Sequence, residues 1–346
     1  MDSVRFVSAS VVVLGHFGLL VGLSPAHSMM TRVLYSLMYC LFNGPAAVIV
    51  FFVVSGFCIH FPFRKAEQIN LAEYVTRRIV RIAPPCAVFV LYFRLVLQDA
   101  GPMGKTVLWS VLCEGIYYLL YPALLVGRRR FGWGRQIVAT AAIAVMIAFF
   151  CAAELVEYRN SYEALGISRT WLIGLPCWIG GCLLAEQFEK FKALSTERIW
   201  LLRGAVFAAS VILRLVKFHV EVFWASNCFT LNLFAVLVYF WLGYELVYFA
   251  QCRKPWLDGA GKWSYSLYLV HTLFAGTIGL LGWGAAVDGS LPWHFVFLLG
   301  VYLASYIFYF LVERPSHRLA MFAGRKIKAL LPSTLKLRTE QVQLVG

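Results

Sequence analysis

Charged residues are scarce in this chain. Asp, Glu, Lys and Arg make up only 14% of its 346 residues, whereas 61% are hydrophobic and the mean hydropathy is +0.74. A soluble globular domain carries about 25% charged residues, so water is excluded as the main solvent of this fold. The 31 Lys and Arg outnumber the 17 Asp and Glu but form short clusters between apolar runs. That distribution argues against a nucleic-acid partner and favours membrane topology signals.

Paired cysteines and metal-ligand spacings are also missing. The nine Cys residues are scattered singly through apolar stretches, without a C-x-x-C pair or a zinc-type His/Cys spacing. A single Cys in such surroundings usually behaves as a small buried hydrophobe. We therefore expect no disulfide and no metal.

Long apolar runs, in contrast, recur along the whole chain. Since about 20 mostly apolar residues cross a hydrocarbon core of about 30 Å as a helix, these runs predict a bundle of about ten transmembrane helices. The expected spans lie at roughly residues 6–23, 44–62, 84–98, 107–126, 136–154, 169–185, 199–218, 226–249, 264–282 and 294–312. We expect an all-α integral membrane protein, with a membrane domain over residues 1–315 and a basic cytoplasmic tail over residues 316–346.

The basic clusters indicate an orientation in the membrane. Lys and Arg collect in cytoplasmic connectors, and every second connector counted from a cytoplasmic N-terminus holds such a cluster, for example Arg128, Arg129 and Arg130. The tail beyond residue 315 is basic as well. This pattern predicts a multi-pass protein of the cytoplasmic (inner) membrane with both termini in the cytoplasm, in contact with membrane lipids.

Three segments depart from simple spans. Asn43-Gly44-Pro45 should break a helix before the apolar run that follows. Residues 70–82, which precede Pro84, mix apolar and basic positions and suit an interfacial helix that ends at this proline. Glu313-Arg314-Pro315 should end the last span with an ion pair and a helix stop.

Arg5 and His16 are the first candidates for function, because titratable groups at membrane depth are costly. Eleven residues of helix return to within about 20° of the starting direction and rise about 16 Å, so both side chains share one helix face. A neutral His16 could take a proton from an acceptor hydroxyl. It could equally be a core histidine bonded to a neighbouring helix.

Arginines and a carboxylate form two further candidates. Arg78 and Arg81 lie three residues apart on one helix face, with Arg77 beside them, and guanidinium groups suit the phosphates of a nucleotide. A positive-inside anchor is the alternative. Glu114 lies in an apolar helix that also carries Ser110, Tyr117, Tyr118 and Tyr121. It either supports His16 or pairs with an Arg to hold the bundle.

Ser264, Tyr268 and His271 form the last candidate set. They follow one another at i, i+4 and i+7 along one helical stripe and could line a path for the acceptor. The alternative is hydrogen bonding between helices, which is common for these residue types in membranes.

Taken in order, these stretches resemble the acyltransferase type 3 family of polytopic membrane O-acyltransferases. The family opens with Asp-x-x-Arg and a His that follows after ten further residues, and here Asp2, Arg5 and His16 have that spacing. The resemblance continues through FFVVSGF (51–57), RRIVRIAP (77–84), WSVLCEGIYYLLYP (109–122), WSYSLYLVH (263–271) and VERP (312–315). It covers nearly the whole chain and matches the standalone form, without an added extracytoplasmic domain.

The resemblance implies a reaction. His16 would be the catalytic base or acyl carrier, with Arg5 and Glu114 supporting it, while Arg77, Arg78 and Arg81 would meet the phosphates of acyl-CoA. The donor would be acetyl-CoA and the acceptor a hydroxyl of a cell-surface, exopolysaccharide or lipid-linked sugar. Envelope-polysaccharide assembly proteins would be partners. The alternative from another class is a transporter of a lipid-linked or acylated saccharide.

Overall fold

Helices form nearly all of the regular structure, because in lipid each backbone polar group needs a partner within its own segment. The computed structural model describes residues 1–18, 29–66, 68–98, 107–157, 165–220, 222–251, 257–331 and 334–336. Its α-helices are α1 (Asp2–Phe17), α2 (Met29–Leu41), α3 (Gly44–His60), α4 (Leu71–Leu95), α6 (Leu108–Phe150), α7 (Ala152–Glu157), α8 (Gly166–Gln187), α9 (Thr196–His219), α10 (Asn227–Gln251), α11 (Asp258–Gly261), α12 (Ser264–Leu280), α13 (Gly284–Gly289), α14 (Leu291–Phe308) and α15 (Arg314–Leu330). Short 3-10 turns lie at Phe61–Phe63, Phe188–Lys190 and Phe223–Ala225, a π-helical turn at Tyr309–Glu313, and strands at β1 (Gln68–Asn70) and β2 (Thr334–Lys336).

Six stretches of the described residues are long and apolar enough to cross a membrane. They are Leu37–Phe63, Leu108–Phe150, Ser168–Lys190, Thr196–His219, Asn227–Gln251 and Leu291–Leu330. An all-α membrane fold is therefore confirmed, whereas the count of about ten spans is not. α1 has 16 residues and α12 has 17, so both are shorter than the roughly 20 residues of a full crossing. Two further expected spans lie in the single helix α6, which bends at Gly132.

Asn43, Gly44 and Pro45 separate α2 from α3, as expected. The Asn43 side chain caps α3 by accepting a hydrogen bond from the Ala46 N–H at 3.2 Å. Pro45 is tolerated there because the first N–H groups of a helix have no intrahelical partner. The Asn43 amide also donates to the Ser210 carbonyl at 2.8 Å, which ties this break to α9.

The expected helix ends at Pro84 and Pro315 are wrong. α4 continues through Pro84 to Leu95, so the basic stretch at residues 70–82 is not a separate interfacial helix. A mid-helix proline removes one backbone hydrogen bond, which the packing of α4 along α15 offsets. Pro315 lies in the first turn of α15, where proline keeps a helical φ.

Glu313 lies at the end of the π-helical turn before α15 and forms hydrogen bonds in place of the expected ion pair with Arg314. Glu313 accepts hydrogen bonds from the Ser266 N–H at 3.1 Å and from its hydroxyl at 2.6 Å. The Arg314 guanidinium lies 4.9 Å from the centre of the Phe310 ring, and among the described residues no ion pair joins it to Glu313. Glu313 therefore ties the turn to α12.

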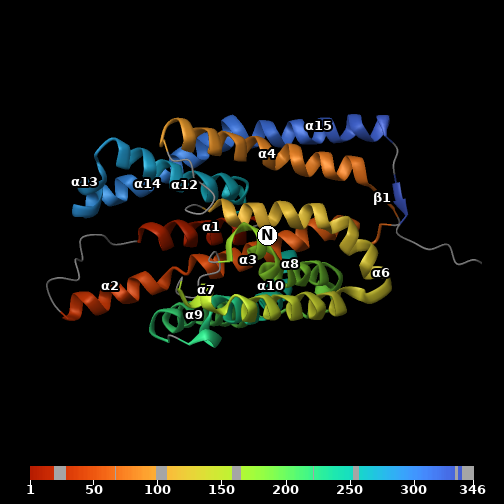
Figure 1. Ribbon diagram of the computed structural model, residues 1–346, viewed down its shortest axis with the longest axis horizontal. Coiled ribbons are helices and arrows are strands. Elements are labelled where there is room, and N and C mark those ends of the chain that lie inside the picture. The colour runs from red at the N-terminus through yellow and green to blue at the C-terminus, as the bar shows by residue number, and fades with distance from the viewer. Residues whose placement is uncertain are drawn as a thin grey trace, which may run out of the picture.

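α4 and α15 lie side by side and antiparallel along one face of the molecule (Figure 1). β1 precedes α4 and pairs antiparallel with β2 beyond α15. Glu73 strengthens this layer, since it pairs with Arg77 of its own helix at 2.6 Å and with Lys328 of α15 at 3.2 Å. The layer fixes the rotation of α4, and with it the direction of its arginines.

Glycines bring α3 and α8 into backbone contact. A Cβ added to Gly56 would lie 2.0 Å from the Trp178 carbonyl oxygen, and one added to Gly181 would lie 2.0 Å from the Val53 carbonyl oxygen. In lipid, such close approach supplies much of the packing energy between helices. α3 is thereby held firmly where it lines the candidate site.

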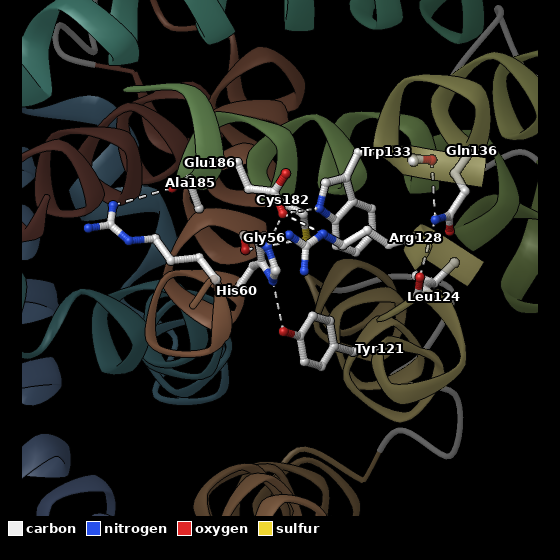
Figure 2. Close-up of polar contacts among 12 residues, drawn as sticks. Gly56, His60, Tyr121, Leu124, Arg128, Trp133, Gln136, Cys182, Ala185 and Glu186 are labelled. Atoms are coloured by element: carbon white, nitrogen blue, oxygen red, sulfur yellow. Dashed lines mark hydrogen bonds and ion pairs between the residues drawn. The ribbon is translucent and has the colours of Figure 1, made fainter. Parts of the chain in front are cut away.

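A polar cluster joins α3, α6 and α8 (Figure 2). The fully buried His60 ring lies 2.9 Å from Glu186 Oε1 through Nε2 and 2.9 Å from the Tyr121 hydroxyl through Nδ1. The same Glu186 oxygen accepts a hydrogen bond from Trp133 Nε1 at 3.0 Å and forms an ion pair with Arg128, whose Nε lies 2.6 Å away. Arg128 and Trp133 lie on the two sides of the α6 bend, so Glu186 fixes its geometry.

Candidate active site

A cavity of about 100 Å³, the arginine cavity, lies among α1, α3, α4, α6 and α12. Its polar lining consists of Arg5, Ser55, Cys58, Arg78, Arg81, Ser110, Glu114, Tyr118, Tyr265 and Tyr268. The remaining lining residues are apolar. The structure thus brings five of the site residues expected from the sequence to one place, from four different helices.

The arginine cavity carries an excess of positive charge. Three arginines, Arg5, Arg78 and Arg81, line it beside the carboxylate of Glu114. Among the described residues neither Arg78 nor Arg81 forms an ion pair, and Arg5 reaches Asp2 only at 4.0 Å. The Arg78 Nε is buried without a hydrogen-bond partner. Guanidinium groups left free in this way are suited to bind phosphate or another anion.

Arg77 lies on a different face of α4. Its guanidinium pairs with Glu73 at 2.6 Å, and a Cβ added to Gly324 of α15 would lie 2.5 Å from Arg77 Cγ. Successive helical residues point about 100° apart, so Arg77 packs against α15 while Arg78 faces the cavity. Arg77 does not line the arginine cavity, so its role in donor binding stays a prediction.

Hydroxyl groups orient Glu114 in the arginine cavity. Its carboxylate accepts a hydrogen bond from the Tyr118 hydroxyl one turn along α6. That hydroxyl lies 3.0 Å from Ser55 Oγ of α3, which also accepts from Trp178 Nε1 of α8 at 3.2 Å. Three helices therefore set the direction of the carboxylate.

His16 lines a second cavity of about 250 Å³, the histidine cavity. Its lining consists of His16, Phe17, Ala275, Ile278, Gly279, Gly284, Val287, His294 and Phe297. The contributing helices α12, α13 and α14 gather at one end of the molecule (Figure 1). Arg5 and His16 both lie on α1, as expected, but the helix rises about 16 Å between them. His16 therefore lines a different cavity from Glu114 and the three arginines.

Tyr268 and His271 of α12 connect the two cavities. Tyr268 lines the arginine cavity, with its hydroxyl 2.5 Å from Ser110 Oγ. The His271 ring centre lies 6.2 Å from that of Tyr268 and 5.2 Å from that of His16. Ser264 instead bonds to a carbonyl three residues back at 2.8 Å and lines neither cavity. Of the expected stripe, Tyr268 and His271 thus lie between the arginine cavity and His16.

Three lining residues carry weaker sequence signals: Cys58, Tyr265 and His294. Cys58 follows Phe51 and Ser55 of the FFVVSGF run at helical spacing. The sequence could therefore have predicted that these three residues share one face of the helix. Tyr265 lies beside the stripe of Tyr268, and its hydroxyl contacts Cys86 Sγ at 3.3 Å. His294 could have been found by the argument that selects His16, because it is a titratable group in an apolar span.

Neither cavity has the composition of a metal centre. Within the part of the chain that the structure describes, no group of three or more His, Cys, Asp or Glu side chains could hold a metal ion. The polar groups of the two cavities are guanidinium groups, hydroxyls, imidazoles and the Cys58 thiol, with Glu114 as an acid.

The helical bundle and the arginine cavity inside it define a polytopic membrane protein with a buried cavity of net positive charge. A family model described as an acyltransferase domain matches residues 1–310 of this chain. The chain therefore belongs to the acyltransferase type 3 family and is a membrane acyltransferase. No curated protein and no solved structure matches the chain.

Proposed function

We propose that this protein is an O-acyltransferase that moves an acyl group, in the simplest case acetyl, from cytoplasmic acyl-CoA to a sugar hydroxyl. The sugar belongs to a cell-surface polysaccharide, an exopolysaccharide or a lipid-linked saccharide. The arginine cavity carries this proposal, because charged side chains inside a membrane protein are costly and mark ligand sites. Three arginines with an excess of positive charge fit the anionic donor that an acyltransferase consumes.

Arg78 and Arg81 bind the donor phosphates in this proposal. A cavity of about 100 Å³ admits only part of an acyl-CoA molecule, so the rest of the nucleotide lies outside it. The Tyr265 hydroxyl provides a neutral hydrogen-bond donor for the thioester end, since the Cys86 thiol can supply the hydrogen of their mutual contact. From there the acyl group has to pass Tyr268 and His271 to reach His16.

The chemistry at His16 can take two forms. In direct transfer, His16 accepts the proton of the acceptor hydroxyl while its oxygen attacks the thioester carbon, and the CoA sulfur leaves and takes up a proton. In the relay form, an imidazole nitrogen of His16 attacks the thioester carbon, the C–S bond breaks, and CoA leaves as a thiol with the proton that the ring gives up. The acceptor oxygen then attacks the acyl-imidazole, and the hydroxyl proton returns to the ring as the ester leaves. Both forms end with one ester and one CoA thiol.

Surface-glycan acetylation in a deletion strain tests the proposal. The strain is complemented with the natural chain or with His16→Ala, and membrane levels of both proteins are matched by immunoblot. We expect O-acetyl groups with the natural chain and none with His16→Ala. Full acetylation by His16→Ala would make His16 a core histidine and contradict this chemistry.

The donor site is tested with purified protein and acetyl-CoA. Arg78→Gln with Arg81→Gln should raise the KM for acetyl-CoA by about tenfold or more, since two charge-assisted contacts are lost. Arg129→Gln, an exposed arginine outside the cavity lining, is the matched control and should leave the KM unchanged. An equal KM for all three proteins would remove the arginine cavity as the donor site.

A transporter of a lipid-linked or acylated saccharide is the alternative, and membership of an acyltransferase family does not favour it. Envelope-polysaccharide assembly proteins are proposed partners under either function. The purified protein separates the two functions, because a transporter leaves acetyl-CoA intact whereas a transferase releases CoA.

A further inference from the structure

The histidine cavity differs chemically from the arginine cavity. Among the described residues that line it, none is an Asp, Glu, Lys or Arg, and their side-chain polar groups are the imidazoles of His16 and His294. Its volume of about 250 Å³ is many times the roughly 10–15 Å³ that one enclosed water needs. A cavity of this size, with no charged group among its described lining residues, fits a neutral polar molecule better than it fits CoA.

His294 presents a free hydrogen-bond acceptor at this cavity. Its side chain is 98% buried, because only 2% of its surface is exposed. Nε2 lies 3.2 Å from the Gly18 carbonyl oxygen, which can only accept, so Nε2 carries the hydrogen. Nδ1 of the neutral ring is then an acceptor, and it is buried without a partner. Such a group costs free energy unless a ligand or water donates to it.

His271 repeats this arrangement one layer deeper. Its ring is fully buried, and Nδ1 donates to the Leu267 carbonyl at 3.1 Å. Nε2 is therefore a second acceptor, and it too is buried without a partner. The ring centre lies 5.2 Å from that of His16. Two imidazoles with tautomers fixed by backbone carbonyls thus offer lone pairs to hydrogen donors: His294 in the lining of the histidine cavity and His271 beside the His16 ring.

We propose that the histidine cavity binds the acceptor substrate through a neutral, hydroxyl-bearing group, and that His294 Nδ1 accepts a hydrogen bond from one of its hydroxyls. The inference rests on the proposed function and adds to it a substrate class, a binding residue and a direction of entry. The acceptor enters at the end of the bundle away from the arginines, and His16 lies where the two substrates meet. His294 binds and positions the acceptor and takes no part in bond making.

Kinetics with two variants of the full chain test this assignment. His294→Phe keeps a ring but removes both nitrogens, whereas His294→Gln keeps a hydrogen-bond acceptor. The proteins are placed in liposomes with radiolabelled acetyl-CoA, and envelope material from the deletion strain serves as acceptor. We expect His294→Phe to raise the half-saturating amount of envelope material by about tenfold, the effect of one buried hydrogen bond, and to leave the half-saturating acetyl-CoA concentration unchanged. His294→Gln should recover most of the loss.

His219→Phe is the matched control, because His219 is exposed at the end of α9 and lines neither cavity. It should behave as the natural chain. The assignment is overturned if His294→Phe leaves acceptor saturation unchanged, if it weakens donor and acceptor equally, or if His294→Gln is as impaired as His294→Phe. A natural chain that transfers no label from acetyl-CoA contradicts the proposed function itself, which is a distinct result.

Discussion

Glu114 is the acidic member of a cavity that is otherwise cationic. Its carboxylate partly offsets the charge of Arg5, Arg78 and Arg81 and holds the Tyr118 hydroxyl. The sequence leaves open whether it supports the reaction or holds the bundle. The two roles differ in kinetics, because donor binding depends on the positive charge whereas the chemical step depends on geometry.

Glu114→Gln should lower kcat by at least about tenfold without raising the KM for acetyl-CoA. The amide keeps the size of the side chain but removes the negative charge, so the arginines attract phosphate no less strongly. Steady-state rates of CoA release over a range of acetyl-CoA concentrations provide the measurement. A raised KM with an unchanged kcat would instead mean that Glu114 only orders the arginines for donor binding.

The bend in α6 is an element-scale feature that depends on one glycine. Gly132 has φ 71° and ψ 165°, a region that only glycine adopts without strain. An added Cβ there would meet nothing within 4 Å, so any cost of substitution comes from the backbone alone. Gly134, two residues on, is helical and equally open.

Gly132→Ala should therefore destabilise the protein by about 1–3 kcal/mol. Gly134→Ala, the same chemical change two residues away, should stabilise it by up to about 1 kcal/mol through helix propensity. Denaturation of both variants in mixed micelles of mild detergent and SDS, followed by tryptophan fluorescence, compares the free energies of unfolding. Equal shifts for the two variants would show that the backbone at Gly132 is not strained by a side chain.

Glu186 joins α3, α6 and α8 through one carboxylate, with its side chain 25% exposed. Glu186→Gln should lower the free energy of unfolding by about 1–3 kcal/mol, because His60, Trp133 and Arg128 lose a charged partner in a partly buried setting. Glu189→Gln is the control: Glu189 is 59% exposed and pairs with Arg64 at 2.8 Å, which is worth about 0–1 kcal/mol. The same assay compares the free energies of unfolding of the two variants. Similar losses would show that the polar cluster around Glu186 does not stabilise the fold.

Across the whole molecule, local patterns predicted more than long-range ones. Apolar runs predicted the helices, and Asn43-Gly44-Pro45 predicted the break before α3, because both depend on neighbours in sequence. The stripes of Arg78 with Arg81 and of Tyr268 with His271 also follow from helical spacing. The continuation of helices past Pro84 and Pro315 depends on packing against distant helices, which no local pattern encodes.

For a related reason, the sequence could not show that His16 and the arginines line different cavities. Helical spacing places Arg5 and His16 on one face and about 16 Å apart, but it does not show which distant helices surround each end. Arg5 meets α4 and α6, whereas His16 meets α12 and α14. For the same reason the contribution of His294, which is 278 residues from His16 in the chain, required the structure.

Orientation in the membrane decides whether the arginine cavity can meet acyl-CoA, which is a cytoplasmic metabolite. Ion pairs of Arg64 with Glu189 and of Arg128 with Glu186 gather basic connectors of α3, α6 and α8 at one end of the bundle. By the positive-inside rule we expect that end to face the cytoplasm. The connector at Leu281–Trp283, between α12 and α13, lies beside the histidine cavity and should face the other side.

Reporter fusions test this orientation for the whole molecule. Green fluorescent protein joined after residue 346 should fluoresce, while alkaline phosphatase, which needs the disulfides of an oxidising compartment, should be inactive there. Alkaline phosphatase inserted at Gly282 should be active and the fluorescent protein dark. The reverse pattern would turn the arginine cavity away from cytoplasmic CoA and remove the donor assignment, whatever the kinetics of the purified protein. Activity of the phosphatase at both sites would contradict an odd number of crossings between them and the cytoplasmic placement of the C-terminus.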